Sequence, residues 1–166
     1  MTERTEPWRG FRIRSARRQP HERGADAQLN EIVDVISVGT TVDVAGARIT
    51  LLSVERYDDG FVATFWFRLA SSENVAFPDY LPQASDDRGG RYVAWPHGGS
   101  GGGNPGRVSW RSATRFAPRL DPAAHELRIE IPEVGLTKAD ESGRIASETV
   151  VEGPWSFRVP VPTRPA

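Results

Sequence analysis

Apolar and polar side chains alternate with a period of two along much of the chain, which is the pattern of half-buried β-strands. The pattern is clearest between residues 61 and 69, where one face carries Phe61, Ala63, Phe65, Phe67 and Leu69 and the other carries Val62, Thr64, Trp66 and Arg68. A short polar turn at 57–60 joins this segment to 47–56, so the two are predicted to form a hairpin. The alternation shifts between Leu51 and Leu52, which indicates a bulge.

Further strands are expected on the same grounds at 32–38 and 40–45 (joined at Gly39), 80–85 and 91–95 (around a turn at 86–90), 107–116, 125–131 and 155–161. The glycine-rich run 97–106 is predicted to be a mobile loop, and 133–152 a long acidic loop. Seven to nine short strands without intervening helices predict an all-β fold, an antiparallel two-sheet sandwich of the immunoglobulin-like kind. A small closed barrel is the alternative, because it gives the same alternation.

Charge divides the chain into two parts. The 166 residues include 21 Lys and Arg and 22 Asp and Glu, for a net charge of −1. Residues 1–24 hold seven Arg and three Glu, a net charge of +4, whereas the remainder holds 14 cations and 19 anions. Large apolar residues are too few in this basic segment to build a core. We therefore expect a largely irregular N-terminal arm at 1–30, a β-domain at 31–162 and a C-terminal tail at 163–166.

The composition argues against most kinds of enzyme. The chain has no cysteine, which excludes disulfides, thiolate nucleophiles and cysteine-ligated metals. The three histidines, His21, His97 and His125, lie far apart in the sequence, and His125 is expected to pack in a strand rather than bind metal. No Gly-x-Ser-x-Gly nucleophile elbow occurs. We expect no catalytic activity and no cofactor. With no apolar run typical of a signal peptide or a membrane span, a cytoplasmic location is predicted.

Two pairs of carboxylates stand in predicted turns. Asp58 and Asp59 precede Gly60, and Asp86 and Asp87 precede Arg88-Gly89. If the two turns lay at the same end of the domain, these four side chains could share a calcium ion, which prefers several oxygen ligands. Aspartate before glycine is also ordinary turn chemistry, so no metal is expected and the four remain only calcium candidates.

Residues suited to binding lie in the arm and on one strand. The arm offers the candidate binding residues Trp8, Arg9, Phe11, Arg12, Arg14, Arg17 and Arg18. Trp66 faces away from the phenylalanine row with Arg68 beside it, as in a protein-contact hot spot, unless the arm covers it. Charged rows at Arg107, Arg111 and Arg115 and at Glu126, Arg128 and Glu130 would form cross-strand ion pairs if their strands were neighbours.

Three short motifs resemble those of a known family. They are G-x-x-V-x-V-x-G at 39–46, D-x-x-G-x-x-Y at 86–92 and Phe-x-Pro at 116–118. In this order they resemble the immunoglobulin-like (telokin-like) sandwich domains of bacterial proteins, which are often found at the cell envelope. The resemblance spans about residues 32–161. It implies a binding or structural module without catalytic machinery. This chain departs from the envelope members because it has no signal peptide or lipid-attachment cysteine.

The sequence therefore favours a non-enzymatic module that binds another macromolecule, most simply a protein, with the arginine-rich arm aiding attachment. One alternative is a nucleic-acid-associated protein that binds through the basic arm. A second alternative is a small carbohydrate-binding or hydrolytic domain that uses the turn carboxylates.

Overall fold

The computed structural model describes residues 31–69, 77–104, 107–139 and 145–162. Within these ranges the chain forms nine β-strands and no helix, so no helix there is long and apolar enough to cross a membrane. The strands are β1 (Ile32–Val44), β2 (Ala47–Tyr57), β3 (Phe61–Leu69), β4 (Phe77–Asp79), β5 (Gln83–Asp86), β6 (Arg91–Asn104), β7 (Arg107–Ala117), β8 (Glu126–Ala139) and β9 (Ile145–Pro160). The expected all-β class is confirmed.

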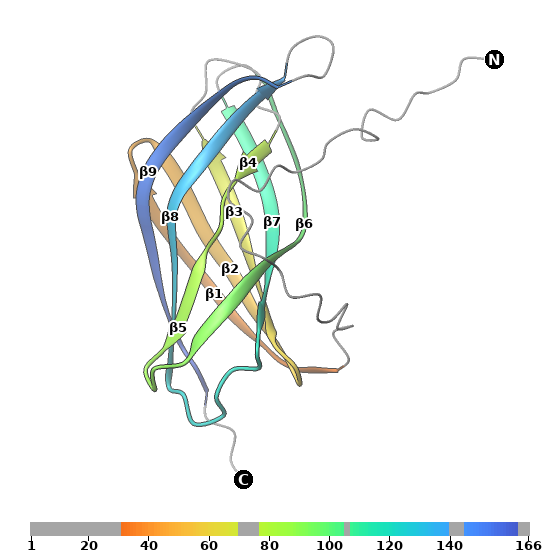
Figure 1. The fold of residues 1–166 in the computed structure, drawn as a ribbon, viewed down its shortest axis with the longest axis vertical. Helices are drawn as coiled ribbons and strands as arrows, with labels where there is room; N and C mark the ends of the chain where they lie inside the picture. The colour runs from red at the N-terminus through yellow and green to blue at the C-terminus, as the bar shows by residue number, and fades with distance from the viewer. Residues whose placement is uncertain (1–30, 70–76, 105–106, 140–144, 163–166) are drawn as a thin grey trace, which may run out of the picture.

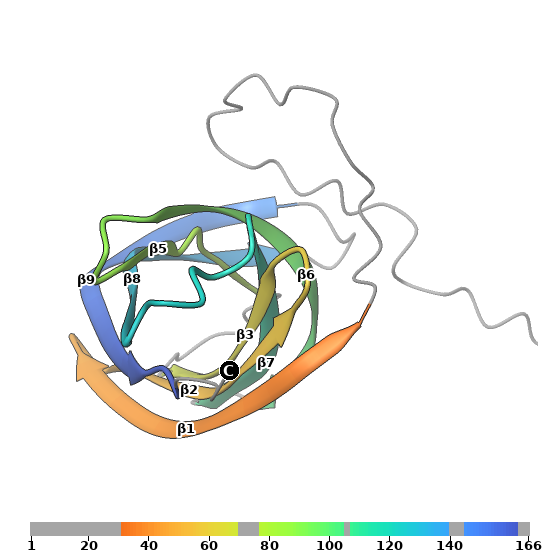
Figure 2. The same cartoon turned by 90° about the horizontal axis from the view of Figure 1, so that it is seen from below.

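All strand pairs are antiparallel, and the hydrogen-bonded order is β1-β2-β3-β7-β6-β5-β8, with β9 and β4 also paired to β8. β9 returns to lie beside β1, so the sheet curls almost into a closed barrel (Figures 1 and 2). Near this seam the indole Nε1–H of Trp155 in β9 donates to the carbonyl oxygen of Ala47, the first residue of β2, at 3.0 Å. A side chain of the last strand is therefore bonded to the β1–β2 hairpin on the other side of the seam.

The β2–β3 hairpin forms where the turn pattern predicts it. The Tyr57 backbone N–H donates to the Gly60 carbonyl oxygen at 2.8 Å, and the pairing shifts register between Leu51 and Ser53, as the broken alternation indicates. The two strands expected on either side of Gly39 are instead one strand, β1, with an irregularity between Ser37 and Thr40. Gly39 has a φ of +68°, a conformation that glycine adopts without steric cost.

The core fills the inside of the barrel with the residues that the alternation placed inward. Its largest fully buried side chains are Trp155, Phe61, Phe65, Phe67, Phe116 and Phe157. The other face of β3 departs from the prediction, because Val62 and Thr64 are also buried there. Arg115 lies directly opposite Val62 in register and pairs with Asp59, so long polar side chains shield this part of the outer face.

The glycine-rich run is a strand, and the prediction of a mobile loop there is wrong. Residues of β6 from Val93 to Asn104 pair with β7. A Cβ atom added to Gly99 would lie 2.8 Å from Trp110 Nε1, and one added to Gly101 would lie 2.6 Å from Trp110 Cε3. The Trp110 ring therefore lies over the glycine backbone. Backbone hydrogen bonds need no side chain, and the neighbouring aromatic ring supplies the packing that glycine lacks.

The predicted acidic loop at 133–152 is also wrong for the described residues. β8 continues to Ala139 and β9 begins at Ile145, with paired positions from Glu133↔Glu152 onward. Val134 is buried and lies opposite Val151, which packs against the core. Leu136 is buried as well, and β8 is flanked on its other edge by β4, which the sequence did not predict. Residues 140–144 lie outside the described part.

Candidate functional site

Trp66 lies on the outer face of the barrel wall formed by β3, β7 and β6. It is directly opposite Arg111 of β7, which in turn is opposite Ser100 of β6. Directly paired residues of antiparallel strands point to the same face, so these three side chains form one row across the outside. Trp66 remains 41% exposed, which confirms the outward orientation expected from the sequence.

Two contacts hold the exposed indole. Its Nε1–H donates to Ser109 Oγ at 2.6 Å, and the Arg68 Cζ atom lies 5.9 Å from the centroid of its ring. The guanidinium is therefore within the range of a cation–π interaction. The hydrogen bond and the cation together fix the orientation of the ring before any partner arrives.

The arginines of this wall differ in their partners. Arg48 pairs with Asp43 at 2.9 Å, and Arg115 pairs with Asp59 at 2.7 Å. Within the described ranges, Arg68 and Arg111 have no carboxylate partner within 4 Å. Because Arg68 and Arg111 flank Trp66, the exposed ring lies beside two positive charges that no carboxylate among the described residues pairs with.

A shallow depression of about 370 Å³ adjoins this row. It is lined by Thr64, Gly98, Gly99, Ser100, Arg111, Ser112 and Ala113. Gly98 lies opposite Ala113, and Ala113 lies opposite Thr64, so three small residues form its floor. Arg111 stands between this depression and Trp66. The combined surface of Trp66, Arg68, Arg111 and the depression is called the Trp66 face below.

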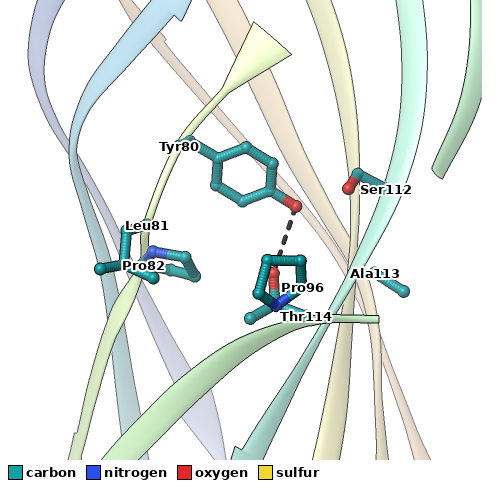
Figure 3. Close-up of a pocket in the computed structure, with 7 residues that line it drawn as sticks. All are labelled: Tyr80, Leu81, Pro82, Pro96, Ser112, Ala113 and Thr114. Carbon is teal, nitrogen blue, oxygen red and sulfur yellow. Dashed lines mark hydrogen bonds between the residues drawn. The ribbon is translucent and has the colours of Figure 1, made fainter. Parts of the chain in front are cut away.

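The second hollow is too small to hold an organic ligand. A cavity of about 30 Å³ lies between β6 and β7 of this wall and the segment that joins β4 to β5, and it is lined by Tyr80, Leu81, Pro82, Pro96, Ser112, Ala113 and Thr114 (Figure 3). Thr114 Oγ1 donates to Tyr80 Oη at 3.3 Å (Figure 3). Burial raises the pKa of Tyr80, although hydrogen bonds to Ser112 and Thr114 oppose the increase. This volume is sufficient for about two water molecules.

The charged rows predicted on neighbouring strands do not meet. β7, which carries Arg111, lies between β3 and β6, whereas β8 lies on the far side of β5. The predicted cross-strand pairs are therefore absent from the described wall, and the charges of β8 are satisfied locally. Arg128 pairs with Glu126 of its own strand at 2.6 Å, and Glu130 accepts a hydrogen bond from Ser156 at 3.2 Å. This topology is the reason that Arg111 has no carboxylate opposite.

The turn carboxylates lie at one end of the barrel, but they are occupied by other contacts. The turns at 57–60 and 86–90 both fall at the lower end in Figure 1. Asp59 binds Arg115, and Asp87 Oδ1 accepts the backbone N–H of His125 at 3.0 Å. Asp58 is exposed. No three His, Asp or Glu side chains gather into a metal-binding group within the described ranges.

Asp86 organises the β5–β6 turn. Its carboxylate accepts the backbone N–H groups of Arg88 at 2.9 Å and Gly90 at 2.7 Å, and the hydroxyl of Tyr92. Partial burial acts to raise the pKa of Asp86, but these three hydrogen bonds together hold it below its usual value. The ring of Tyr92 contacts Phe61 edge-on, with centroids 5.1 Å apart. The D-x-x-G-x-x-Y motif thus has a structural role, because it links the β5–β6 turn to the core.

His125 does not pack as the sequence suggested. It is exposed just before β8, and its backbone rather than its imidazole is used, by Asp87. The arm candidates Trp8, Arg9, Phe11, Arg12, Arg14, Arg17 and Arg18 lie outside the described residues. Of the predicted binding residues, Trp66 is therefore the one placed by the structure. Arg111 and Ser109 were missed as its neighbours, since they are more than forty residues away in sequence.

Comparison with known proteins bears on the fold. No protein-family model matches the chain, and no curated protein sequence matches it. The structure is similar to that of a conserved domain protein from Bacillus anthracis, with a TM-score of 0.55 and 16% sequence identity. The match covers 75% of this chain and 48% of the Bacillus protein, so this chain spans about half of its length. At this identity the likeness concerns the fold alone.

Proposed function

We propose that this protein is a non-enzymatic binding module that uses the Trp66 face to engage an acidic segment of another protein. The observation that carries the proposal is the exposed Trp66 ring, held by Ser109 and flanked by Arg68 and Arg111. Neither arginine has a carboxylate partner within the part of the chain that the structure describes.

The residue types on this face are those that contribute most to protein interfaces. Tryptophan and arginine are enriched among the few residues that carry most of the binding energy. The planar guanidinium of Arg111 can bind a carboxylate through two parallel hydrogen bonds, which a partner rich in Asp or Glu would provide. The depression beside Arg111 gives room for a partner side chain next to this ion pair.

The basic arm fits the same kind of partner. Residues 1–24 carry a net charge of +4, the same sign as the uncompensated charges of the Trp66 face. An acidic partner would be attracted by both, which raises the rate of encounter more than the final affinity. We therefore retain the proposal that the arm aids attachment.

We also propose the immunoglobulin-like assignment within the all-β class, and a cytoplasmic location. The strand pairings support a two-layer arrangement inside the nearly closed barrel. β1, β2, β3 and β7 with most of β6 make one layer, and β4, β5, β8 and β9 make the other. The two layers are joined through the first two residues of β6, which pair with β5.

The proposed function is tested with a fluorescent peptide of alternating Glu and Leu residues and the full-length chain. We expect saturable binding that weakens about 30-fold in Trp66→Ala, the equivalent of about 2 kcal/mol for a hot-spot residue. Arg111→Gln should weaken binding too, whereas Arg128→Gln, on the exposed face of β8, is the matched control and should not.

Three results would overturn the proposal. One is the absence of saturable binding, and another is equal affinity for the wild-type chain, Trp66→Ala and Arg111→Gln. The third is binding of a single-stranded oligothymidine that depends on Trp66. A different outcome would point to the basic arm. If the chain does not bind the peptide, but both the wild type and Trp66→Ala bind oligothymidine, recognition is of nucleic acid through the arm. The affinity for oligothymidine should then fall steeply as the salt concentration rises.

A further inference from the structure

One edge of β6 is open over most of its length. β6 pairs with β7 from Val93 to Asn104, but with β5 only at Arg91 and Tyr92. Figure 1 shows β5 and β6 diverging from their shared turn. From Val93 onward, the edge of β6 that faces away from β7 therefore has no strand partner among the described residues. Such an edge presents unpaired backbone N–H and C=O groups, which are a template for another strand.

Apolar side chains stand exposed along this opening. Val93 is 55% exposed, and Trp95 of the same strand is also exposed. On the other side of the opening, Leu81 is exposed as well. Beyond Trp95, the run from Gly98 to Gly101 leaves its backbone accessible because its residues have small side chains or none. Exposed apolar groups beside an unpaired edge favour the approach of an extended chain.

The usual protection of an edge strand is nearly absent here. Natural sheets guard their edges with charged side chains, prolines and bulges. No Asp, Glu, Lys or Arg occurs from residue 92 to residue 106. Protection is limited to Pro96 and to the register shift between Pro96 and Gly98. An incoming strand therefore meets no Asp, Glu, Lys or Arg side chain of β6 itself.

We propose that two copies of this chain associate through antiparallel pairing of their β6 edges. A second β6 is the occupant that fits best, because a strand without charge meets its own copy without repulsion. A two-fold axis between antiparallel strands makes the contact self-complementary and closed. The basic arm finds no acidic side chain on β6 from residue 92 onward, and the charge that would attract the acidic segment of the proposed function, Arg111, belongs to β7 rather than to β6. Pairing also removes Val93 and Trp95 from water, which favours association.

The test measures the mass of the full-length chain by sedimentation velocity, from low to several hundred micromolar. We expect a concentration-dependent monomer–dimer equilibrium. Val93→Lys puts a strongly hydrated charge where the contact removes the exposed Val93 from water, and it should raise the dimer dissociation constant by more than about tenfold. Val150→Lys is the matched control, since Val150 is comparably exposed on β9, away from this edge, and it should leave the equilibrium unchanged.

Hydrogen exchange identifies the strand that pairs. Backbone amides between Val93 and Gly101 should be better protected at high than at low protein concentration. A chain that stays monomeric throughout would overturn the proposal, and so would a dimer that Val93→Lys leaves intact. Protection of these amides that is independent of concentration would assign the edge to a segment of the same chain and would equally refute it. Trp66→Ala should not alter dimerisation, which separates this test from the proposed function.

Discussion

The two halves of β6 are ordered by different means. In the first half, Tyr92 is buried, donates to Asp86 and accepts the Asp121 backbone N–H at 3.3 Å, while its ring contacts Phe61. In the second half, from Gly98 onward, the strand has almost no side chains of its own. It is held by pairing with β7 and covered on its inner face by the Trp110 ring.

This difference separates two ways in which a sequence specifies a strand. The first half is held by one of its own side chains, Tyr92, so its stability depends on side-chain contacts that a substitution can remove. The second half is packed by the Trp110 ring of the neighbouring strand β7, so its stability depends on the absence of side chains at the glycine positions. Substitutions that shorten a side chain should therefore destabilise the protein in the first half. Substitutions that add a side chain should destabilise it in the second half.

The largest effect is expected from Phe61→Ala, which removes the β3 side chain that Tyr92 of the anchored half contacts. Phe61 is fully buried, stacks on Phe116 with centroids 4.8 Å apart and receives the edge of Tyr92. Its removal should lower the free energy of unfolding by about 3–5 kcal/mol, measured by urea denaturation of the full chain. Val93→Ala, at an exposed position next to Tyr92, should change it by less than about 0.5 kcal/mol. Equal losses in both variants would contradict the assigned anchor.

An intermediate effect is expected from Gly101→Ala in the glycine half. The new Cβ would lie 2.5 Å from the Ser109 carbonyl oxygen and 2.6 Å from Trp110 Cε3. Such overpacking should cost about 1–3 kcal/mol. Gly98→Ala provides the control, because nothing lies within 4 Å of its added Cβ. It should be neutral or slightly stabilising. If the urea midpoints of the two variants coincide, Trp110 does not cover this strand.

The smallest effect concerns the charge on Asp86. Its folded pKa is depressed by the Tyr92, Gly90 and Arg88 hydrogen bonds against the opposing effect of burial, so its contribution is present at neutral pH. This contribution is lost as pH falls below about 4, the ordinary aspartate pKa, toward the lower folded value. Tyr92→Phe should cost about 1.5 kcal/mol at pH 7 and reduce the loss of stability between pH 5 and pH 3. Parallel pH profiles of urea midpoints for wild type and variant would reject this role.

Local pattern was a good guide wherever each strand carries its own apolar face. The inward row of β3, the bulge at Leu52 and the outward Trp66 are properties of neighbouring residues, so they could be predicted. The sequence pattern did not predict the second half of β6 or the extensions of β8 and β9. Glycine and acidic residues interrupt the apolar–polar alternation there, and neighbouring strands supply the packing. The pattern also missed the burial of Val62, whose register partner Arg115 comes from a distant part of the chain.

The residues of the candidate site also divide into those that the sequence predicted and those that it did not. Trp66 and Arg68 share a face because they are two residues apart on one strand, and this was predictable. Their neighbour Arg111 was not, because the register between β3 and β7 is set by pairing across more than forty residues. The expected ion pairs between Arg111 and the charges of β8 failed for the same reason.

By itself, the sequence determined which residues face inward and where most turns fall, because alternation and turn chemistry depend on adjacent residues. Tertiary structure alone decided which strands become neighbours and, among the described residues, which arginines lack a carboxylate partner and which strand edge lacks a strand partner. The physical reason is that strand pairing uses backbone groups that nearly every residue possesses. The choice among pairings is therefore made by closure of the barrel around its core rather than by the residues of any one strand.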